Sequence, residues 1–165
     1  MKPLIISMGN RYRCDDCIGP YTLDLLKPML GGSCDFIECV GDTSALLDIW
    51  QHRDKVFLID ACKTADSTDT SAIKTGHIFR LDGLNESLPN DNPVSSNHAI
   101  SIANAIELGK LMNQIPRSLT IYSLAGKDFS QGDVISPPLL TAAQEAATLI
   151  CNEIKPGDNL CMNTP

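Results

Sequence analysis

The chain has little positive charge and no long hydrophobic run. Its 165 residues carry 13 Lys and Arg against 20 Asp and Glu, so the formal net charge is −7 at pH 7. Nucleic acids are bound through basic surfaces, and anionic membranes attract basic segments; this composition suits neither. No apolar stretch approaches the roughly 18 residues of a membrane-spanning helix. We therefore expect neither a nucleic acid nor a membrane as a partner.

Common hydrolase and nucleotide-binding motifs are also missing. The sequence has no HExxH zinc motif, no GxSxG nucleophile turn and no paired motif of the pepsin type. No GxGxxG follows the first expected strand, which disfavours nucleotide binding at the turn around Gly9 and Asn10. Hydrolytic chemistry on this chain would need a different set of residues.

The start of the chain and its cysteines favour a cytoplasmic protein. The apolar run Leu4-Ile5-Ile6-Ser7-Met8 is too short for the core of a signal peptide. The seven cysteines are odd in number and irregularly spaced, which is not typical of a disulfide framework. We expect most of them to be thiols, and four to fill small apolar gaps: Cys34, Cys39, Cys62 and Cys151.

Apolar runs alternate with helical patterns along the chain. Strands are expected over residues 3–8, 35–40, 56–59 (ending at Asp60), 77–81 and 119–124, and helices over residues 19–29, from 42 or 43 to 50, from 97 or 98 to 112, and from 137 to 154. This alternation predicts an α/β fold with a mainly parallel five-stranded sheet between helices. The strand at 77–81, short and flanked by polar loops, is expected at an antiparallel edge. Residues 1–154 are expected to form a single domain and residues 155–165 a loose tail.

The most informative segment, residues 9–20, follows the first strand and reads Gly-Asn-Arg-Tyr-Arg-Cys-Asp-Asp-Cys-Ile-Gly-Pro. It places the adjacent acids Asp15 and Asp16 at the carboxyl end of a buried strand, where open parallel sheets bind ligands. Two acids in a sharp turn repel each other unless a cation or a proton lies between them. One of them is expected to point into a site, and the other to stabilise the turn or cap a helix.

Two further residues are expected near the same edge of the sheet. Asp60 ends the third strand, and His98 opens the helix that follows the fourth strand and its long loop. With Asp16 they form a mixed oxygen and nitrogen ligand set, which suits a divalent transition metal with open coordination positions. The alternative is structural: Asp60 hydrogen-bonds a loop, and the His98 ring is solvated. His52 and His77 fit less well, since one lies in a charged loop and the other begins a strand.

Cys14 and Cys17 bracket the two acids as a CxxC pair. This spacing is typical of a redox dithiol or of half a zinc site. A second matched pair is missing because Cys34 and Cys39 are spaced differently. Two ordinary thiols in a loop are the simpler interpretation, and a dithiol oxidoreductase remains an alternative function.

The chain resembles the hydrogenase maturation endopeptidases. The matching residues occur in the same order over nearly the whole chain: Gly9-Asn10, Asp15-Asp16, Gly19-Pro20, Leu58-Ile59-Asp60-Ala61, Ser96-Asn97-His98, Gly126, Phe129, Gly132 and Ser136-Pro137. The resemblance implies a twisted five-stranded sheet between helices. It also implies an activity, which is removal of the C-terminal extension from the large-subunit precursor of a nickel–iron hydrogenase after nickel insertion.

By this resemblance Asp16, Asp60 and His98 contact nickel that the precursor supplies, and Asp16 or Asp60 activates the attacking water. The implied protein is an aspartic-type endopeptidase, expected to be a monomer with no tightly bound metal at rest. One departure concerns the family's Asp-Gly-Gly after the second strand: here the acid is displaced to Asp42. This departure keeps a second alternative open, a nickel-binding assembly module that does not cleave.

Overall fold

The computed structural model describes residues 1–40, 42–63, 73–86 and 97–155, with only the backbone described for 97–100. The strands are β1 (Leu4–Met8), β2 (Asp35–Cys39), β3 (Lys55–Lys63), β4 (Ile78–Asp82) and β5 (Ser118–Gly126). The helices are α1 (Ile18–Leu30), α2 (Thr43–Trp50), α3 (Asn97–Met112) and α4 (Pro137–Ile154), with short 3-10 helices η1 (Cys14–Cys17) and η2 (Gly31–Ser33). The expected tail lies, apart from Lys155, outside the described residues.

The five strands form a sheet in the order β2-β1-β3-β5-β4. β1 pairs in parallel with β2 and β3, and β3 pairs in parallel with β5. β4 runs antiparallel to β5 at the edge. The expected α/β class, mainly parallel sheet and antiparallel edge strand are therefore confirmed. None of the helices in the described parts of the chain has the length and hydropathy that a membrane crossing requires.

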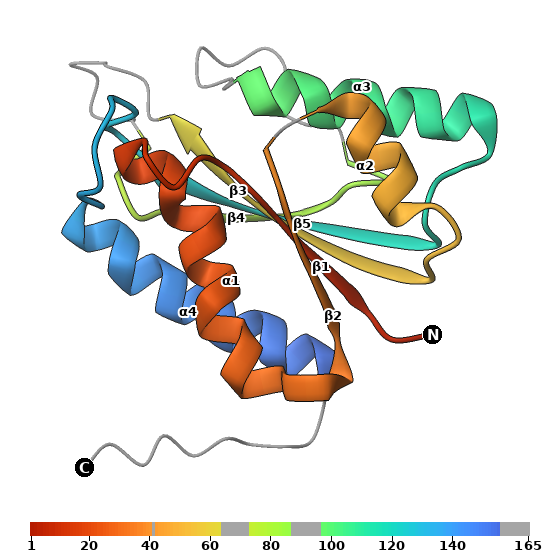
Figure 1. The fold of residues 1–165 in the computed structure, drawn as a ribbon, viewed down its shortest axis with the longest axis horizontal. Helices are drawn as coiled ribbons and strands as arrows, with labels where there is room; N and C mark the ends of the chain where they lie inside the picture. The colour runs from red at the N-terminus through yellow and green to blue at the C-terminus, as the bar shows by residue number, and fades with distance from the viewer. Residues whose placement is uncertain (41, 64–72, 87–96, 156–165) are drawn as a thin grey trace.

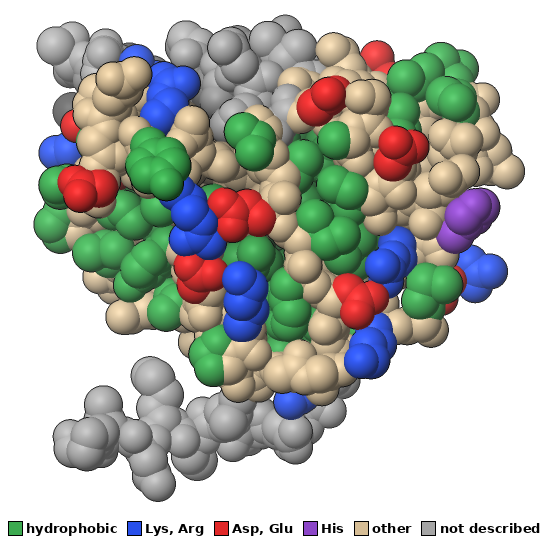
Figure 2. Space-filling view, in the orientation of Figure 1, with side chains coloured by type: hydrophobic (Ala, Val, Ile, Leu, Met, Phe, Trp, Pro, Cys, Tyr) green, Lys and Arg blue, Asp and Glu red, His purple; other side chains and the backbone are tan. Residues whose placement is uncertain are grey.

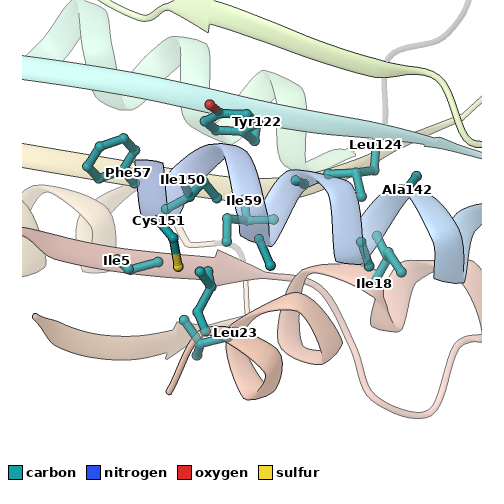
Figure 3. Packing of buried hydrophobic residues seen from close by; sticks show 14 of the residues in the cluster. Ile5, Ile18, Leu23, Phe57, Ile59, Tyr122, Leu124, Ala142, Ile150 and Cys151 are labelled. Atoms are coloured by element: carbon teal, nitrogen blue, oxygen red, sulfur yellow. The ribbon is translucent and has the colours of Figure 1, made fainter. Parts of the chain in front are cut away.

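Helices cover both faces of the sheet, α1 and α4 on one and α2 and α3 on the other (Figure 1). The sequence of β3 explains this, because successive side chains of a strand point to opposite faces. Phe57 and Ile59 belong to the core under α1 and α4, which Figure 3 shows with Leu23 and Ile150. Val56 and Leu58, which point to the opposite face, belong to the core under α2 and α3.

Two expected strand ends were wrong, and hydrogen bonding explains both. β3 does not end at Asp60 but continues to Lys63, and β5 continues to Gly126, because the two strands stay paired in register to their ends. α1 ends at Leu30, one residue beyond the expected Met29, and includes Pro28. A proline this close to the end of a helix removes a single backbone hydrogen bond, so the last turn still forms.

A glycine brings the start of α1 into direct contact with the sheet. A Cβ atom on Gly19 would lie 2.1 Å from the carbonyl oxygen of Met8 and 3.0 Å from that of Ile59. Real Cβ atoms do not approach backbone oxygens so closely. The missing side chain therefore lets the first turn of α1 rest on the carboxyl ends of β1 and β3.

An ion-pair network joins the far end of α4 to the sheet. Arg80 donates from Nε and Nη2 to the two carboxylate oxygens of Glu153, at 2.7 and 2.9 Å. The hydroxyl of Tyr122 also donates to this carboxylate. The hydrogen bonds from Arg80 are the main reason why the pKa of Glu153 lies below its ordinary value.

We expect Gly19→Ala to lower the free energy of unfolding by about 3 kcal/mol, because the added methyl group overpacks rigid backbone. Urea denaturation measures this difference. Gly32→Ala is the matched control: its Cβ would have no heavy atom within 4 Å, so its effect should stay within about 0.5 kcal/mol. Equal effects of the two substitutions would contradict the close packing of α1.

The lowered pKa of Glu153 predicts acid sensitivity. A carboxylate whose folded-state pKa is depressed stabilises the fold above its unfolded pKa, about 4.3 for Glu. This stability is lost as the pH falls through the folded-state pKa. Urea midpoints measured from pH 7 to pH 3 should therefore fall less steeply below about pH 4.3 in Glu153→Gln than in the wild type. Exposed Glu145 on the same helix provides the control, Glu145→Gln, whose profile should follow the wild type.

Candidate active site

Asp16 lies in η1, directly after the turn that follows β1, and only 4% of it is exposed. Its Oδ2 accepts a hydrogen bond from the backbone N–H of Asn10 at 3.1 Å. The turn depends on Gly9, which has φ +128° and whose Cβ would lie 2.0 Å from the carbonyl oxygen of Asp16. Only glycine adopts this backbone conformation readily, so Gly9 permits the turn that brings Asp16 back to the end of β1.

Asp60 is buried within β3, at the point where its neighbour β1 stops. The last pairing between β1 and β3 joins Ser7 to Ile59, and the next residue is Asp60. On the other side Asp60 pairs with Ser123 of β5. By the alternation along β3, its side chain shares the α2 and α3 face of the sheet with Leu58. Asp60 therefore lies at the expected edge even though the strand continues beyond it.

The two carboxylates lie at the same edge of neighbouring strands. η1 packs against β3, and α1 begins on the carbonyl of Ile59, the residue before Asp60. Asp16 and Asp60 are both almost fully buried, and a buried carboxylate is costly unless a cation, a proton or hydrogen-bond donors compensate it. This pair is the chemically unusual feature of the edge.

His98 is the second residue of α3, and its ring lies outside the described residues. The next turn of α3 is fixed, because Thr43 at the start of α2 donates through Oγ1 to the carbonyl oxygen of Ser101 at 3.2 Å. Figure 1 shows α3 beginning at the end of the molecule toward which β3 points. Its backbone thus starts on the face that Asp60 shares. Convergence of His98 with the two carboxylates stays a prediction.

The described side chains, which do not include the His98 ring, form no cluster of three or more potential metal ligands. Asp16 and Asp60 are the described carboxylates that could contribute to such a site.

Asp15, the other acid of the motif, has a structural role. Asp15 is fully buried, and its carboxylate accepts hydrogen bonds from the loop between β5 and α4. The donors are the backbone N–H of Lys127 (2.8 Å), of Asp128 (3.0 Å) and of Ser136 (2.7 Å), and the hydroxyl of Ser136 (2.9 Å). Asp15 therefore fixes this loop. Ser136 occupies the N-cap position of α4, but its hydroxyl donates to Asp15 and not to the helix.

The backbone strengthens the connection between these two loops. The N–H of Cys14 donates to the carbonyl of Gly132 at 3.0 Å, and the N–H of Gly132 donates to the carbonyl of Tyr12 at the same distance. Glycine is needed at the end of β5 and in the loop that follows it. A Cβ on Gly126 would lie 2.8 Å from the Asp15 Cβ, and a Cβ on Gly132 would lie 2.8 Å from the Cys14 Sγ. These glycines were visible in the sequence, but their contact with the motif was not.

The other side of the motif is held by charge. Arg11 donates to Asp24 of α1 and to Glu38 of β2, with shortest distances of 2.8 Å to each. Lys27 adds a 3.0 Å contact to Asp24, and Figure 2 shows neighbouring basic and acidic side chains over α1 and β2. The hydrogen bond from Arg11 lowers the pKa of Asp24. These groups are substantially exposed, so we expect them to orient the loop more than to stabilise the fold.

The cysteines give little support to a redox site. Cys14 and Cys17 are free thiols, and burial raises the pKa of Cys17, which disfavours the reactive thiolate. Three cysteines are buried as expected: Cys34, Cys39 and Cys151. Cys62 was expected to be an apolar filler, but it is only half-buried. It lies two residues beyond Asp60 on the same face of β3, and burial raises the pKa of its thiol. The sequence reasoning therefore missed a thiol beside the candidate site.

No family model and no curated protein matches this chain by sequence. By structure the chain has the fold of the hydrogenase maturation proteases. It aligns with the [NiFe] hydrogenase maturation protease HybD from Thermococcus kodakarensis at a TM-score of 0.71 and 18% identity, over 94% of this chain and 100% of that one. The hydrogenase maturating endopeptidase HybD from E. coli gives 0.65 and 18%, over 91% and 90%. A hydrogenase 2 maturation peptidase from a Thaumarchaeota archaeon gives 0.63 and 20%, over 93% and 98%. The fold implied by the sequence resemblance is thus confirmed.

Asp15→Asn is expected to lower the free energy of unfolding by about 2–4 kcal/mol, because an amide NH2 would replace one acceptor oxygen and face N–H donors. Urea denaturation measures this loss of stability. Asp48→Asn, at an exposed position of α2, is the control and should change stability by no more than about 0.5 kcal/mol. An Asp15→Asn protein as stable as the control would show that the carboxylate does not hold the loop.

Proposed function

We propose that this protein is an endopeptidase that removes the C-terminal extension of a nickel–iron hydrogenase large-subunit precursor after nickel has been inserted. The observation that carries the proposal is the pair of buried carboxylates, Asp16 and Asp60, at the carboxyl edge of β1 and β3. The fold supports it, since the solved structures with this fold include proteins named as hydrogenase maturation proteases.

In this proposal the nickel belongs to the substrate. Asp16, Asp60 and His98 bind the nickel of the precursor and so place the scissile peptide bond beside the carboxylates. Nickel–oxygen and nickel–imidazole bonds suit this set of ligands. A precursor without nickel would lack the anchor, so cleavage would follow metal insertion. No resident metal is needed in the resting enzyme.

The chemistry assigned to the protein is proton transfer. One carboxylate, Asp16 or Asp60, accepts a proton from water while the water oxygen bonds to the scissile carbonyl carbon. The carbon–nitrogen bond then breaks, and the proton passes to the departing amine. Burial favours this role because it keeps bulk water from the carboxylate and strengthens its interaction with the substrate. The substrate nickel would polarise the scissile carbonyl.

The two alternative functions, a dithiol oxidoreductase and a non-cleaving assembly module, require different features of the protein. A dithiol oxidoreductase needs an accessible low-pKa cysteine, whereas burial raises the pKa of Cys17. A non-cleaving assembly module would need the same metal contacts but would leave the precursor intact. Asp42, the displaced acid that raised this alternative, caps α2 by accepting from the N–H of Ser44 at 2.8 Å. Monomeric state and cytoplasmic location stay predictions.

We expect Asp16→Asn, Asp60→Asn and His98→Ala each to slow processing of nickel-loaded precursor by roughly 100-fold or more, as loss of an acid–base or positioning group does. Intact-mass spectrometry of the precursor measures loss of the extension, and circular dichroism verifies that each variant is folded. The matched controls are Asp48→Asn and His52→Asn. Asparagine is chosen at position 52 because the backbone there has φ +62°, which asparagine tolerates.

Normal processing by the Asp16 or His98 variant would contradict the metal-docking role. A wild-type protein that binds nickel-loaded precursor without shortening it would favour the assembly module. Cys17→Ala provides a further control, since it removes the CxxC pair and the proposed mechanism uses neither thiol.

A further inference from the structure

Four exposed basic side chains follow the edge of the sheet that carries the candidate active site. Three of them belong to strands that are adjacent in the sheet: Lys63 ends β3, Lys127 directly follows β5, and Lys74 precedes β4. The fourth, Arg13, lies in the loop after β1, the neighbour of β3 on its other side. We call these four residues the basic edge.

Backbone pairing holds the three lysine positions side by side. Lys63 is paired in register with Gly126, the residue directly before Lys127. A backbone N–H of the turn that begins at Lys74 donates to the carbonyl of Ala125 at 2.8 Å. Neighbouring strands lie only about 4.8 Å apart, so the long side chains that follow them can contact one extended segment.

The cations of the basic edge have no acidic partner among the residues that the structure describes. Each of the other arginines of the chain forms an ion pair with Asp or Glu. Arg13 instead donates to the backbone carbonyl of Phe129 at 2.9 Å. Lys63, Lys74 and Lys127 form no ion pair within the described parts of the chain. These charges are therefore available to a partner.

The exposed charge beside the basic edge is mainly positive. Asp15, Asp16 and Asp60 are buried, and their carboxylates serve the loop contact and the candidate site. The exposed acids described along these strand ends are Asp128 and Asp133. Asp128 already accepts two hydrogen bonds from the serine two residues further on. The basic edge is thus a positive surface on a chain whose net charge is −7.

This charge distribution favours a partner with a short acidic segment. Complementary charges steer an approaching molecule and fix its orientation. A nucleic acid carries negative charge along its whole length, so the acidic remainder of this protein would repel it. An acidic stretch of a polypeptide can match the basic edge alone.

We propose that the basic edge binds an acidic polypeptide segment of the precursor. Lys63 lies three residues beyond Asp60 on β3, and Arg13 lies three residues before Asp16, so the bound segment flanks both carboxylates and orients the precursor toward them. This docking role rests on the proposed proteolytic function and adds a recognition element that does not involve the nickel.

The kinetic test is the double variant Lys63→Gln, Lys127→Gln, which removes two charges and keeps the backbone pairing of both residues. With nickel-loaded precursor at low salt, kcat/KM should fall by roughly fivefold to tenfold and kcat should stay unchanged, because charges at the rim of an interface act on encounter and orientation. Added NaCl should lower kcat/KM less steeply in this variant than in the wild type.

Lys2→Gln, Lys155→Gln is the matched control. It removes the same amount of charge from the opposite edge of the sheet, where β1 begins and α4 ends. Its kcat/KM and salt dependence should equal those of the wild type. Thermal unfolding verifies that both double variants are as stable as the wild type.

A second readout depends on neither turnover nor nickel. A carbodiimide joins a carboxylate to a lysine amine where the two groups are in contact. In a mixture of the wild type with nickel-free precursor, it should link Asp or Glu of the precursor to lysines of the basic edge, and peptide mass spectrometry locates each link. Lys2 and Lys155 should not be linked.

The outcomes separate the docking role from the proteolytic function. If the wild type cleaves nickel-loaded precursor but the Lys63 and Lys127 double variant keeps the wild-type kcat/KM and salt dependence, the docking proposal is overturned and the proposed function stands. Links to Lys2 as frequent as links to Lys63 would also overturn the docking proposal. If the wild type leaves nickel-loaded precursor intact, the proteolytic function is overturned, whereas links confined to the basic edge would still support the acidic partner.

Discussion

The contact between Gly19 and the carbonyl oxygens of Met8 and Ile59 is the constraint on which the candidate site depends. It leaves no space for a side chain between the start of α1 and the ends of β1 and β3. η1 immediately precedes α1, so this packing also fixes the position of Asp16 against the edge that contains Asp60. Backbone contacts are short and stiff compared with side-chain contacts, and close packing transmits small displacements. The placement of the carboxylates is therefore built into the fold rather than into flexible loops.

The two adjacent acids, Asp15 and Asp16, have different roles. Asp15 accepts four hydrogen bonds from the loop after β5, so its charge is compensated by donors within the protein. Asp16 lies one residue further on in η1, directly before the helix that rests on the sheet. Because the same turn carries both residues, the loop between β5 and α4 is held beside the candidate site.

The pattern of apolar runs predicted the fold class, the antiparallel edge and most helix boundaries, because both faces of the sheet had to be buried. The pattern did not predict features that depend on contacts between residues far apart in the sequence. The ends of β3 and β5 depend on their mutual pairing, and the role of Asp15 depends on a loop more than 100 residues away in sequence. The edge location of Asp16 and Asp60 followed from the ends of parallel strands.

The proposed function requires Asp16, Asp60 and His98 to bind one metal ion at the carboxyl edge of the sheet. A crystal structure of the protein soaked with nickel or cadmium, with the ion located by anomalous scattering, tests it most directly. The expected result is a single strong site coordinated by both carboxylates and by a nitrogen of His98. An ion bound elsewhere, or side chains of these three residues directed to separate regions, would contradict it.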